Sequence, residues 1–253
     1  LSSSSAASDV YKRQVLLRVR RIGVCGSDVH VYHGKHPFTP YPVVQGHEFS
    51  AVVEAVGANV AGVRVGDLVT ATPQRVCGTC RPCRRGDYHI CDLLAVRGFQ
   101  APGCAQDLFV TEAAKIVPLP SSFTFEEGAL VEPVAVGVHS VSRAGDMNGR
   151  NVAVLGAGPI GNLLAQVAQA LGARILITDI SDFRLDVARR CGLEATSNAR
   201  TESLAEFDHT WRRHRDLSHQ RPPVGVCAGN APRRSAAIRS RMLLQFRLDA
   251  LDS

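Results

Sequence analysis

Long apolar runs are missing from this chain of 253 residues. No stretch approaches the roughly 20 consecutive apolar residues that a membrane-spanning helix needs, and nothing at the start resembles a secretory signal peptide. Apolar residues make up 45% of the chain and charged residues 21%, which is typical of a globular protein in water. We therefore expect a cytoplasmic protein with no membrane partner, long enough for one large domain or two modest ones.

A basic character spread over the whole chain is also missing. The formal net charge is +6, but residues 207–253 hold nine Arg against four Asp, a balance of +5 that leaves only +1 for the other 206 residues. Neither interleaved aromatic residues nor a helix-turn-helix pattern accompanies this basic segment. We therefore expect no nucleic-acid partner.

Cysteines, by contrast, are concentrated in one short segment. Cys77, Cys80, Cys83 and Cys91 are separated by two, two and seven residues, among Gly, Pro and Arg. Four thiolates so close in the chain can surround one ion as a tetrahedron, the geometry of a structural zinc. An iron–sulfur cluster uses the same ligands, whereas two disulfides would need an oxidising compartment that no signal indicates. The spacing favours one structural Zn²⁺.

A glycine-rich turn lies between a short buried strand, expected over residues 151–155, and an apolar helix, expected over 159–171. It has the sequence Gly156-Ala-Gly158-Pro159-Ile160-Gly161. The three glycines allow a tight turn, close approach of a pyrophosphate to the backbone, and close packing of helix on strand. The helix N-terminus supplies free N–H groups and the positive end of a dipole. A second strand over 174–178 and an amphipathic helix over 183–191 complete a βαβ pattern that predicts dinucleotide binding.

An acidic residue follows the second of these strands. Asp179 stands eighteen residues after Gly161, where a carboxylate accepts hydrogen bonds from the adenosine ribose and repels a 2′-phosphate. Arg184 is the nearby cation that would tolerate such a phosphate. The placement favours NAD over NADP, although Asp179 also suits the N-terminus of the following helix.

Two short motifs precede the cysteine segment. Cys25-Gly-Ser27-Asp28-Val-His30 follows an alternating strand, and Gly46-His47-Glu48 interrupts the next β segment. With the cysteine segment and the glycine-rich turn, they make the chain resemble the medium-chain zinc-dependent alcohol and polyol dehydrogenases, from about Val15 to about Arg200. The sorbitol (L-iditol) dehydrogenase branch is most similar, because no cysteine stands where many alcohol dehydrogenases have a third zinc ligand.

The resemblance implies a second, catalytic Zn²⁺ that keeps one position open for the substrate. Its ligands would be Cys25 and His47, with Glu48 or Glu132 as the third, bound directly or through water. The sequence leaves open which glutamate it is. Asp28 would orient His47 from behind.

The same resemblance implies a fold and domain boundaries. We expect α/β plus β architecture: a GroES-like β-barrel catalytic domain over 15–133, followed by the first half of a Rossmann doubly wound domain over 134–206. Strands are expected over Val15–Val24, over Val43–Val56 with a break at Gly46, and within Ala105–Pro120, and helices over Phe125–Leu130 and Val134–Arg143.

The two ends of the chain agree less well with the family. Residues 1–14 have the composition of a non-native leader, and residues 207–253 that of an aberrant tail, as a frameshift would produce. After about Glu206 only Val224–Asn230 resembles a family element, the fourth Rossmann strand. We therefore expect an incomplete chain with poor solubility, weak NAD binding and little turnover.

The implied reaction is hydride transfer from a secondary alcohol, most simply a polyol such as sorbitol, iditol or xylitol, to NAD. Ser27 and His30 would pass the substrate proton to solvent, with Glu48 as a further catalytic residue; the alternative for His30 is an ordinary surface histidine. Threonine 3-dehydrogenase and butanediol dehydrogenase share these motifs. An inactive zinc-binding fragment is the alternative of another class. The full-length form is expected to be a homo-oligomer.

Overall fold

The computed structural model describes residues 12–203, 224–227 and 243–245. The chain divides into two compact units, Leu1–Glu132 and Pro133–Ser253. Most of the expected leader and tail lies outside the described residues. Lys12 and Arg13 are described, and their carbonyls accept hydrogen bonds from the N–H groups of Asn59 and Ala113. The first unit therefore includes residues before the expected Val15.

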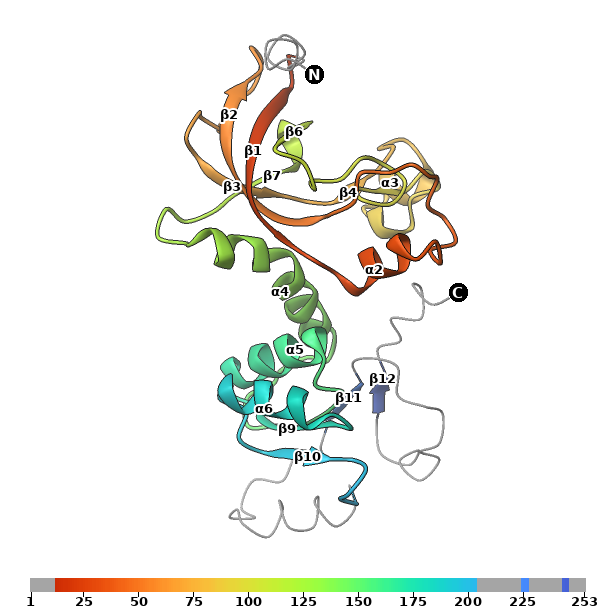
Figure 1. The fold of residues 1–253 in the computed structure, drawn as a ribbon, viewed down its shortest axis with the longest axis vertical. Helices are drawn as coiled ribbons and strands as arrows, with labels where there is room; N and C mark the ends of the chain where they lie inside the picture. Colours follow the sequence, from red (N-terminus) through yellow and green to blue (C-terminus); the bar gives the residue numbers. More distant parts are fainter. Residues whose placement is uncertain (1–11, 204–223, 228–242, 246–253) are drawn as a thin grey trace. The chain divides into compact units, whose positions relative to one another are not determined.

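The first unit is built on a five-stranded antiparallel sheet (Figure 1). The strands lie in the order β6-β1-β2-β3-β7. Their bounds are β1 (Gln14–Gly23), β2 (Glu48–Val56), β3 (Leu68–Ala71), β6 (Leu108–Glu112) and β7 (Ile116–Pro118). Val15, Leu17, Phe49, Val53, Val69 and Phe109 form its buried core.

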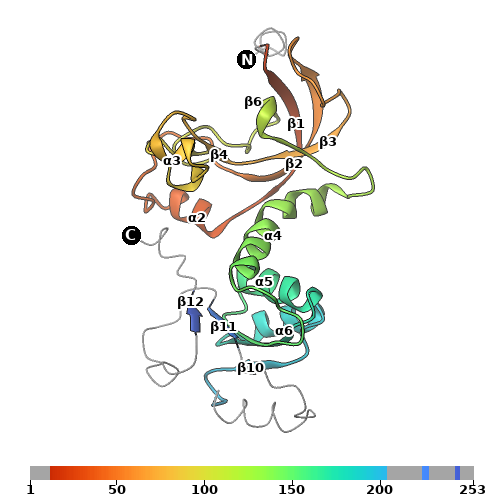
Figure 2. The same ribbon diagram turned by 180° about the vertical axis from the view of Figure 1, so that it is seen from behind.

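Outside this sheet the first unit holds short elements. They are α2 (Gly26–Tyr32), the strand pair β4 (Gln74–Arg75) and β5 (Ala95–Val96), α3 (Arg81–Arg84), and the 3-10 turns η1 (Tyr88–Ile90) and η2 (Ala113–Lys115). Strands β4 and β5 flank the cysteine lobe, which we define as residues 77–91. Views from opposite sides both place α2 beside this lobe (Figures 1 and 2).

The expected strand over Val43–Val56 is too long. Strand β2 begins only at Glu48, because the preceding backbone bonds elsewhere: the carbonyls of Val44, Gln45 and Gly46 accept the N–H groups of residues 103, 105 and 104. Gly46 has a φ of +91°, which an L-residue adopts only under strain. The chain therefore turns at Gly46 and enters the sheet at Glu48.

The two helices expected around Pro133 form a single helix, α4 (Phe125–Arg143). Proline removes one backbone donor and usually breaks or kinks a helix, which is why the sequence predicts two pieces. The boundary between the two units falls inside this helix.

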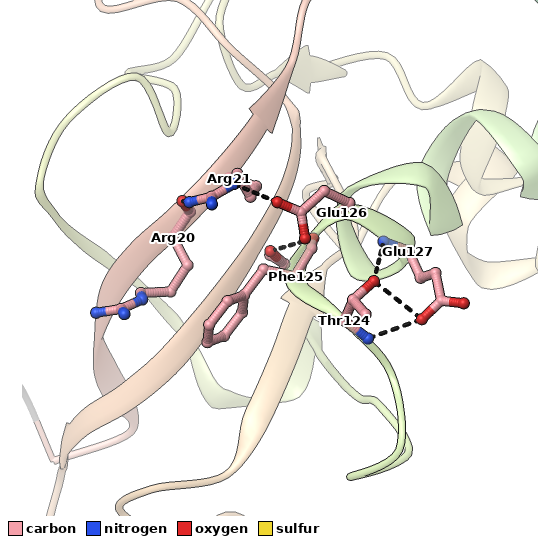
Figure 3. A network of polar contacts seen from close by, with 7 residues as sticks. Arg20, Arg21, Thr124, Phe125, Glu126 and Glu127 are labelled. Atoms are coloured by element: carbon pink, nitrogen blue, oxygen red, sulfur yellow. Dashed lines mark hydrogen bonds and ion pairs between the residues drawn. The ribbon is translucent and has the colours of Figure 1, made fainter.

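The start of α4 is fixed to the first unit by side chains (Figure 3). Arg21 pairs with Glu126 at 2.6 Å, and the Arg20 guanidinium lies 5.0 Å from the centre of the Phe125 ring. Thr124 and Glu127 exchange hydrogen bonds in a capping box. A Cβ on Gly128 would lie 2.8 Å from the Cβ of Ser50, so only glycine lets α4 pack this closely on β2.

The second unit contains a five-stranded parallel sheet in the order β10-β9-β8-β11-β12. Its elements are β8 (Asn151–Leu155), α5 (Pro159–Ala170), β9 (Arg174–Asp179), α6 (Asp182–Arg190), β10 (Thr196–Asn198), β11 (Val224–Cys227) and β12 (Leu243–Gln245). Strands β8 and β9 and both helices agree with the expected ranges within two residues.

Strand β11 pairs in parallel with β8, where the sequence places a fourth Rossmann strand. Strand β12 is not expected from the sequence, because three residues are too few to show a period. The edge of β8 away from β9 is therefore paired with β11. In the part of the chain that the structure describes, no helix is both long and apolar enough to cross a bilayer.

Candidate metal and nucleotide sites

The four sulfurs of the cysteine lobe converge on one point. The Sγ atoms of Cys77, Cys80, Cys83 and Cys91 all lie within 4.8 Å of one another. Three of the separations are 3.6, 3.9 and 3.9 Å. A tetrahedron with zinc–sulfur bonds of about 2.3 Å has edges of about 3.8 Å, whereas a disulfide would bring two sulfurs to about 2.05 Å. These distances fit a tetrahedral zinc and exclude a disulfide.

Backbone N–H groups prepare this lobe for negative charge. The N–H groups of Cys80 and Thr79 donate to the Cys77 sulfur at 3.3 and 3.4 Å, and they lower the pKa of the Cys77 thiol to about 6. Burial instead raises the pKa of the Cys83 thiol to about 12. Four thiolates together therefore require a cation, and the residues fit the structural Zn²⁺ expected from the spacing.

A second group of metal-ligating side chains gathers at the end of β1 and the start of β2. Ligand atoms of Cys25, His47 and Glu48 lie within 4.8 Å of one another. The sheet register explains this, because Gly23 pairs with Glu48 across β1 and β2 and Cys25 follows two residues later. One thiolate, one imidazole and one carboxylate, with a position left open, fit a catalytic zinc.

Gly23 gives the Glu48 carboxylate its place in this group. A Cβ on Gly23 would lie 2.3 Å from Glu48 Oε2 and 2.9 Å from Glu48 Cβ. We therefore expect Gly23→Ala to push the Glu48 side chain out of the group and to weaken zinc binding there by about tenfold or more. Zinc titration measures this, with Gly26→Ala as the control, since a Cβ on Gly26 meets nothing within 4 Å. Equal zinc affinity in both variants would contradict the assignment of Glu48 as a ligand.

Asp28 contacts both Cys25 and His47, of which the resemblance implies only the contact with His47. Its Oδ2 accepts the Cys25 backbone N–H at 3.0 Å, and its Oδ1 lies 3.6 Å from His47 Nδ1. Burial works against the charge on Asp28, but His47 and the N–H groups of Cys25 and Gly46 outweigh burial and lower its pKa. Nδ1 thus faces Asp28, which leaves Nε2 of His47 for a metal.

The charges around His47 favour a cation at this position. Burial alone lowers the pKa of His47, yet Asp28 and Cys25 together raise it to about 10. Burial raises the pKa of Glu48. A proton on His47 and a metal ion on its nitrogen satisfy the same negative surroundings, so metal binding would displace this proton.

The other candidate catalytic residues lie outside the group formed by Cys25, His47 and Glu48. Glu132, on α4, is not among the three grouped ligands; burial raises its pKa, and it interacts electrostatically with His47 and Glu48. Ser27 and His30 both lie on α2, and His30 is exposed. Within the described residues no hydrogen bond joins Ser27 to His30, so the relay remains a prediction.

The glycine-rich turn has the expected geometry for a phosphate. Gly156 adopts a φ of +108°, and its N–H donates to the Thr178 carbonyl of β9 at 2.7 Å. Gly158 caps α5, and a Cβ there would meet nothing within 4 Å, so the space beside it is open. The N–H groups of Ile160 and Gly161, after Pro159, belong to the first turn, which has no intrahelical acceptors. This cradle fits a pyrophosphate.

Asp179 lies at the end of β9, where the sequence places the ribose-binding carboxylate. It is buried; Oδ2 accepts the Ala157 N–H at 2.8 Å and Oδ1 accepts the Ser181 N–H at 2.9 Å. Arg184 approaches Oδ2 at 3.6 Å. Each carboxylate oxygen has a second lone pair, so these contacts leave capacity for a further hydrogen bond. Asp179 thus also connects the glycine-rich turn to the start of α6.

Two metal-ligand groups in a unit built on an antiparallel sheet, followed by a parallel α/β unit with a dinucleotide turn, are typical of a zinc-type dehydrogenase architecture. The alcohol dehydrogenase GroES-like domain family matches residues 11–121. This match covers less than half of the chain, and over a longer stretch the chain is similar to the dehydrogenases described below. The expected fold class, a GroES-like domain followed by a Rossmann unit, is confirmed.

The chain is 37% identical over 196 residues to 2-dehydro-3-deoxy-L-galactonate 5-dehydrogenase of Pseudoalteromonas atlantica, covering 77% of this chain and 58% of the relative. It is 34% identical over 196 residues to L-threonine 3-dehydrogenase of Legionella pneumophila, covering 76% and 57%. The crystal structure of galactitol-1-phosphate dehydrogenase from Escherichia coli superposes with a TM-score of 0.76 at 30% identity, covering 87% and 62%. The chain thus spans about six-tenths of the length of these proteins.

Sequence reasoning missed two residues that shape the candidate metal site. Gly23 was not singled out, although a glycine opposite a ligand carboxylate is a recognisable signal once the strand register is known. Phe99, whose ring centroid lies 5.1 Å from that of His47, received no role either. The two residues are 52 positions apart, and a local sequence pattern does not predict a contact over that separation.

Proposed function

We propose that the chain carries the metal and nucleotide sites of a zinc-dependent dehydrogenase that transfers hydride from a secondary alcohol to NAD. The grouping of Cys25, His47 and Glu48 supports this most directly, because a thiolate, an imidazole and a carboxylate around an open position suit a catalytic zinc. The cradle at Gly158 and the acidic residue at Asp179 supply the second requirement, a nucleotide site.

In this proposal Cys25, His47 and Glu48 hold the metal, and Asp28 orients His47 through its Nδ1 side, opposite the metal. Zinc, when bound, supplies Lewis acidity that favours loss of the hydroxyl proton, and NAD supplies the hydride acceptor. Ser27 and the exposed His30 carry that proton toward solvent along α2. Glu132, raised in pKa by burial, is a second proton acceptor near His47.

The substrate class that we propose is a small polyol of the sorbitol, iditol or xylitol type. Two similar proteins are named for polyhydroxylated substrates, a 2-dehydro-3-deoxy-L-galactonate and galactitol 1-phosphate. L-Threonine is the second candidate, because proteins named L-threonine 3-dehydrogenase are 34–39% identical to this chain. Both substrates present a secondary hydroxyl to the same metal group.

A substrate panel tests the proposal. The zinc-loaded chain is mixed with NAD and, in turn, sorbitol, L-iditol, xylitol, L-threonine and 2,3-butanediol, and NADH absorbance is followed at high enzyme concentration. Substrate-dependent NADH formation supports a dehydrogenase, and the preferred substrate separates polyol from threonine. Zinc and NADH binding without any NADH formation would instead support a fragment without turnover.

Asp179 is expected to set the choice of NAD over NADP. Asp179→Ser should lower the ratio of NAD to NADP affinity by about tenfold, because it removes a hydrogen bond to a charged group and the repulsion of a 2′-phosphate. Fluorescence titration with NADH and NADPH measures both affinities. Asp182→Ser is the matched control, since this nearby carboxylate is exposed and accepts from Asn198 instead.

Because Asp179 also accepts the Ala157 and Ser181 N–H groups, Asp179→Ser is expected to weaken the turn itself. The preference ratio separates the two effects, since a loosened turn lowers both affinities alike. An unchanged ratio would show that Asp179 acts only on the fold.

A further inference from the structure

Phe99 lies between two histidine rings in the first unit. Its centroid is 4.8 Å from that of His36, stacked at 24°, and 5.1 Å from that of His47, tilted at 46°. All three side chains are buried, with exposed fractions of 5%, 9% and 7% for Phe99, His36 and His47. His36 is held in turn by Thr39, whose Oγ1 lies 2.7 Å from its Nδ1. The ring on the far side of Phe99 is therefore fixed too.

The backbone that carries Phe99 is closely constrained. The N–H groups of Phe99, Gln100 and Ala101 all donate to the Val96 carbonyl, and the Gly98 N–H donates to Ala101. Gly98 has a φ of +87°, and a Cβ there would lie 2.9 Å from the Gly46 nitrogen. The loop is thus pressed against the residue that precedes His47.

A buried arginine attaches this loop to the main sheet. Arg97 donates to Thr111 Oγ1 at 2.7 Å and pairs with Glu112 on β6, and its guanidinium lies 4.9 Å from the centre of the Phe109 ring. Phe99 therefore reaches His47 from a loop that is fixed on both the sheet side and the Gly46 side.

His47 needs such a support because its ring torsion has no sharp preference of its own. The χ2 torsion of histidine is broad, while a metal ligand must be aimed within about 10–20°. Asp28 touches one edge of the imidazole, at 3.6 Å from Nδ1, which leaves rotation about that contact free. The Phe99 ring, packed against His47 at a tilt of 46° and itself stacked on His36, restricts this rotation.

We propose that Phe99 is a positioning residue that fixes the plane of the His47 imidazole and so aims its free nitrogen at the metal position shared with Cys25 and Glu48. The inference rests on the proposed function for the metal, although the orientation of the ring is a property of the metal-free chain. A planar side chain at residue 99 is required, and an apolar one of equal volume is not enough.

Co²⁺ titration of the full chain, after the cysteine lobe has been filled with Zn²⁺, tests the proposal through the visible spectrum of the second site. Phe99→Met keeps volume and burial but loses the flat face, and it should raise the Co²⁺ dissociation constant by about tenfold. Phe99→Tyr keeps the face and should restore the wild-type constant and spectrum. Phe99→Leu replaces Phe99→Met in the same comparison should the latter not fold.

Val69→Ala is the control for a general loss of core packing, because Val69 is fully buried in the same unit and belongs to the sheet core. It should lower the urea midpoint at least as much as Phe99→Met while leaving the Co²⁺ constant unchanged. Equal Co²⁺ affinity in Phe99→Met and the wild type, or an equal loss in Val69→Ala, would overturn the proposal.

The ¹⁵N resonances of the His47 ring in the metal-free chain provide a readout that needs no metal. A single, sharp set of His47 ring resonances is expected in the wild type and in Phe99→Tyr, and a second or exchange-broadened set in Phe99→Met, because the ring then adopts more than one orientation. Equally sharp single sets in all three would overturn the proposal. If the wild type takes up no Co²⁺ at the second site, the proposed metal function fails, and these resonances still decide the role of Phe99.

Discussion

Replacing Cys80 by Ser is expected to leave the chain with one zinc ion in place of two and to lower its thermal midpoint by about 10 °C or more. Cys80 supplies one corner of the four-sulfur group, at 3.9 Å from the Cys91 sulfur, and caps helix α3. A hydroxyl is a poor zinc ligand, so three thiolates would remain close together without the charge that balances them.

The measurement for Cys80→Ser is metal analysis of the purified chain, together with thermal unfolding before and after treatment with a chelator. Cys191→Ser is the matched control, because Cys191 is an exposed thiol outside the metal groups of the described residues. The control should keep two ions and the wild-type midpoint. Two ions in Cys80→Ser as well would mean that the lobe does not need its second cysteine.

The parts of the molecule that could be predicted from sequence depend on residues close together in the chain. The cysteine lobe spans residues 77–91, so its spacing alone predicts the group that the structure brings together. The nucleotide turn is similarly local, and the strand before it matches the expected range at both ends. In each case one short segment contains both the functional residues and the pattern that predicts their local structure.

The parts that could not be predicted depend on register and on contacts between distant segments. That Gly23 makes room for Glu48 follows from the pairing of β1 with β2, and a sequence pattern does not give a register. The contact between Phe99 and His47 depends on a loop held by Arg97 and Gly98. Helix α4 continues through Pro133 against local preference, and its first turns are fixed to the sheet by Arg20 and Arg21.

Cys25→Ser is expected to remove the second zinc ion and to lower any dehydrogenase turnover by about a thousandfold or more, while the cysteine lobe keeps its own ion. A bound zinc ion lowers the pKa of a water ligand from about 15.7 to about 7 in favourable sites, and it would acidify an alcohol hydroxyl in the same way. This effect is lost without the metal. Loss of one ligand should be sufficient, because a catalytic zinc site needs three protein ligands and only His47 and Glu48 would remain.

The fold of Cys25→Ser should be intact, which makes its result easy to interpret. Cys25 is the N-cap of helix α2, and serine is among the preferred N-cap residues, so the helix is not weakened. The Asp28 contact to the backbone N–H of residue 25 does not involve the side chain that is changed. Unfolding in urea should therefore match the wild type, and His47→Gln should lose the same ion. Two zinc ions in Cys25→Ser, measured by metal analysis, would mean that the catalytic site lies elsewhere in the chain.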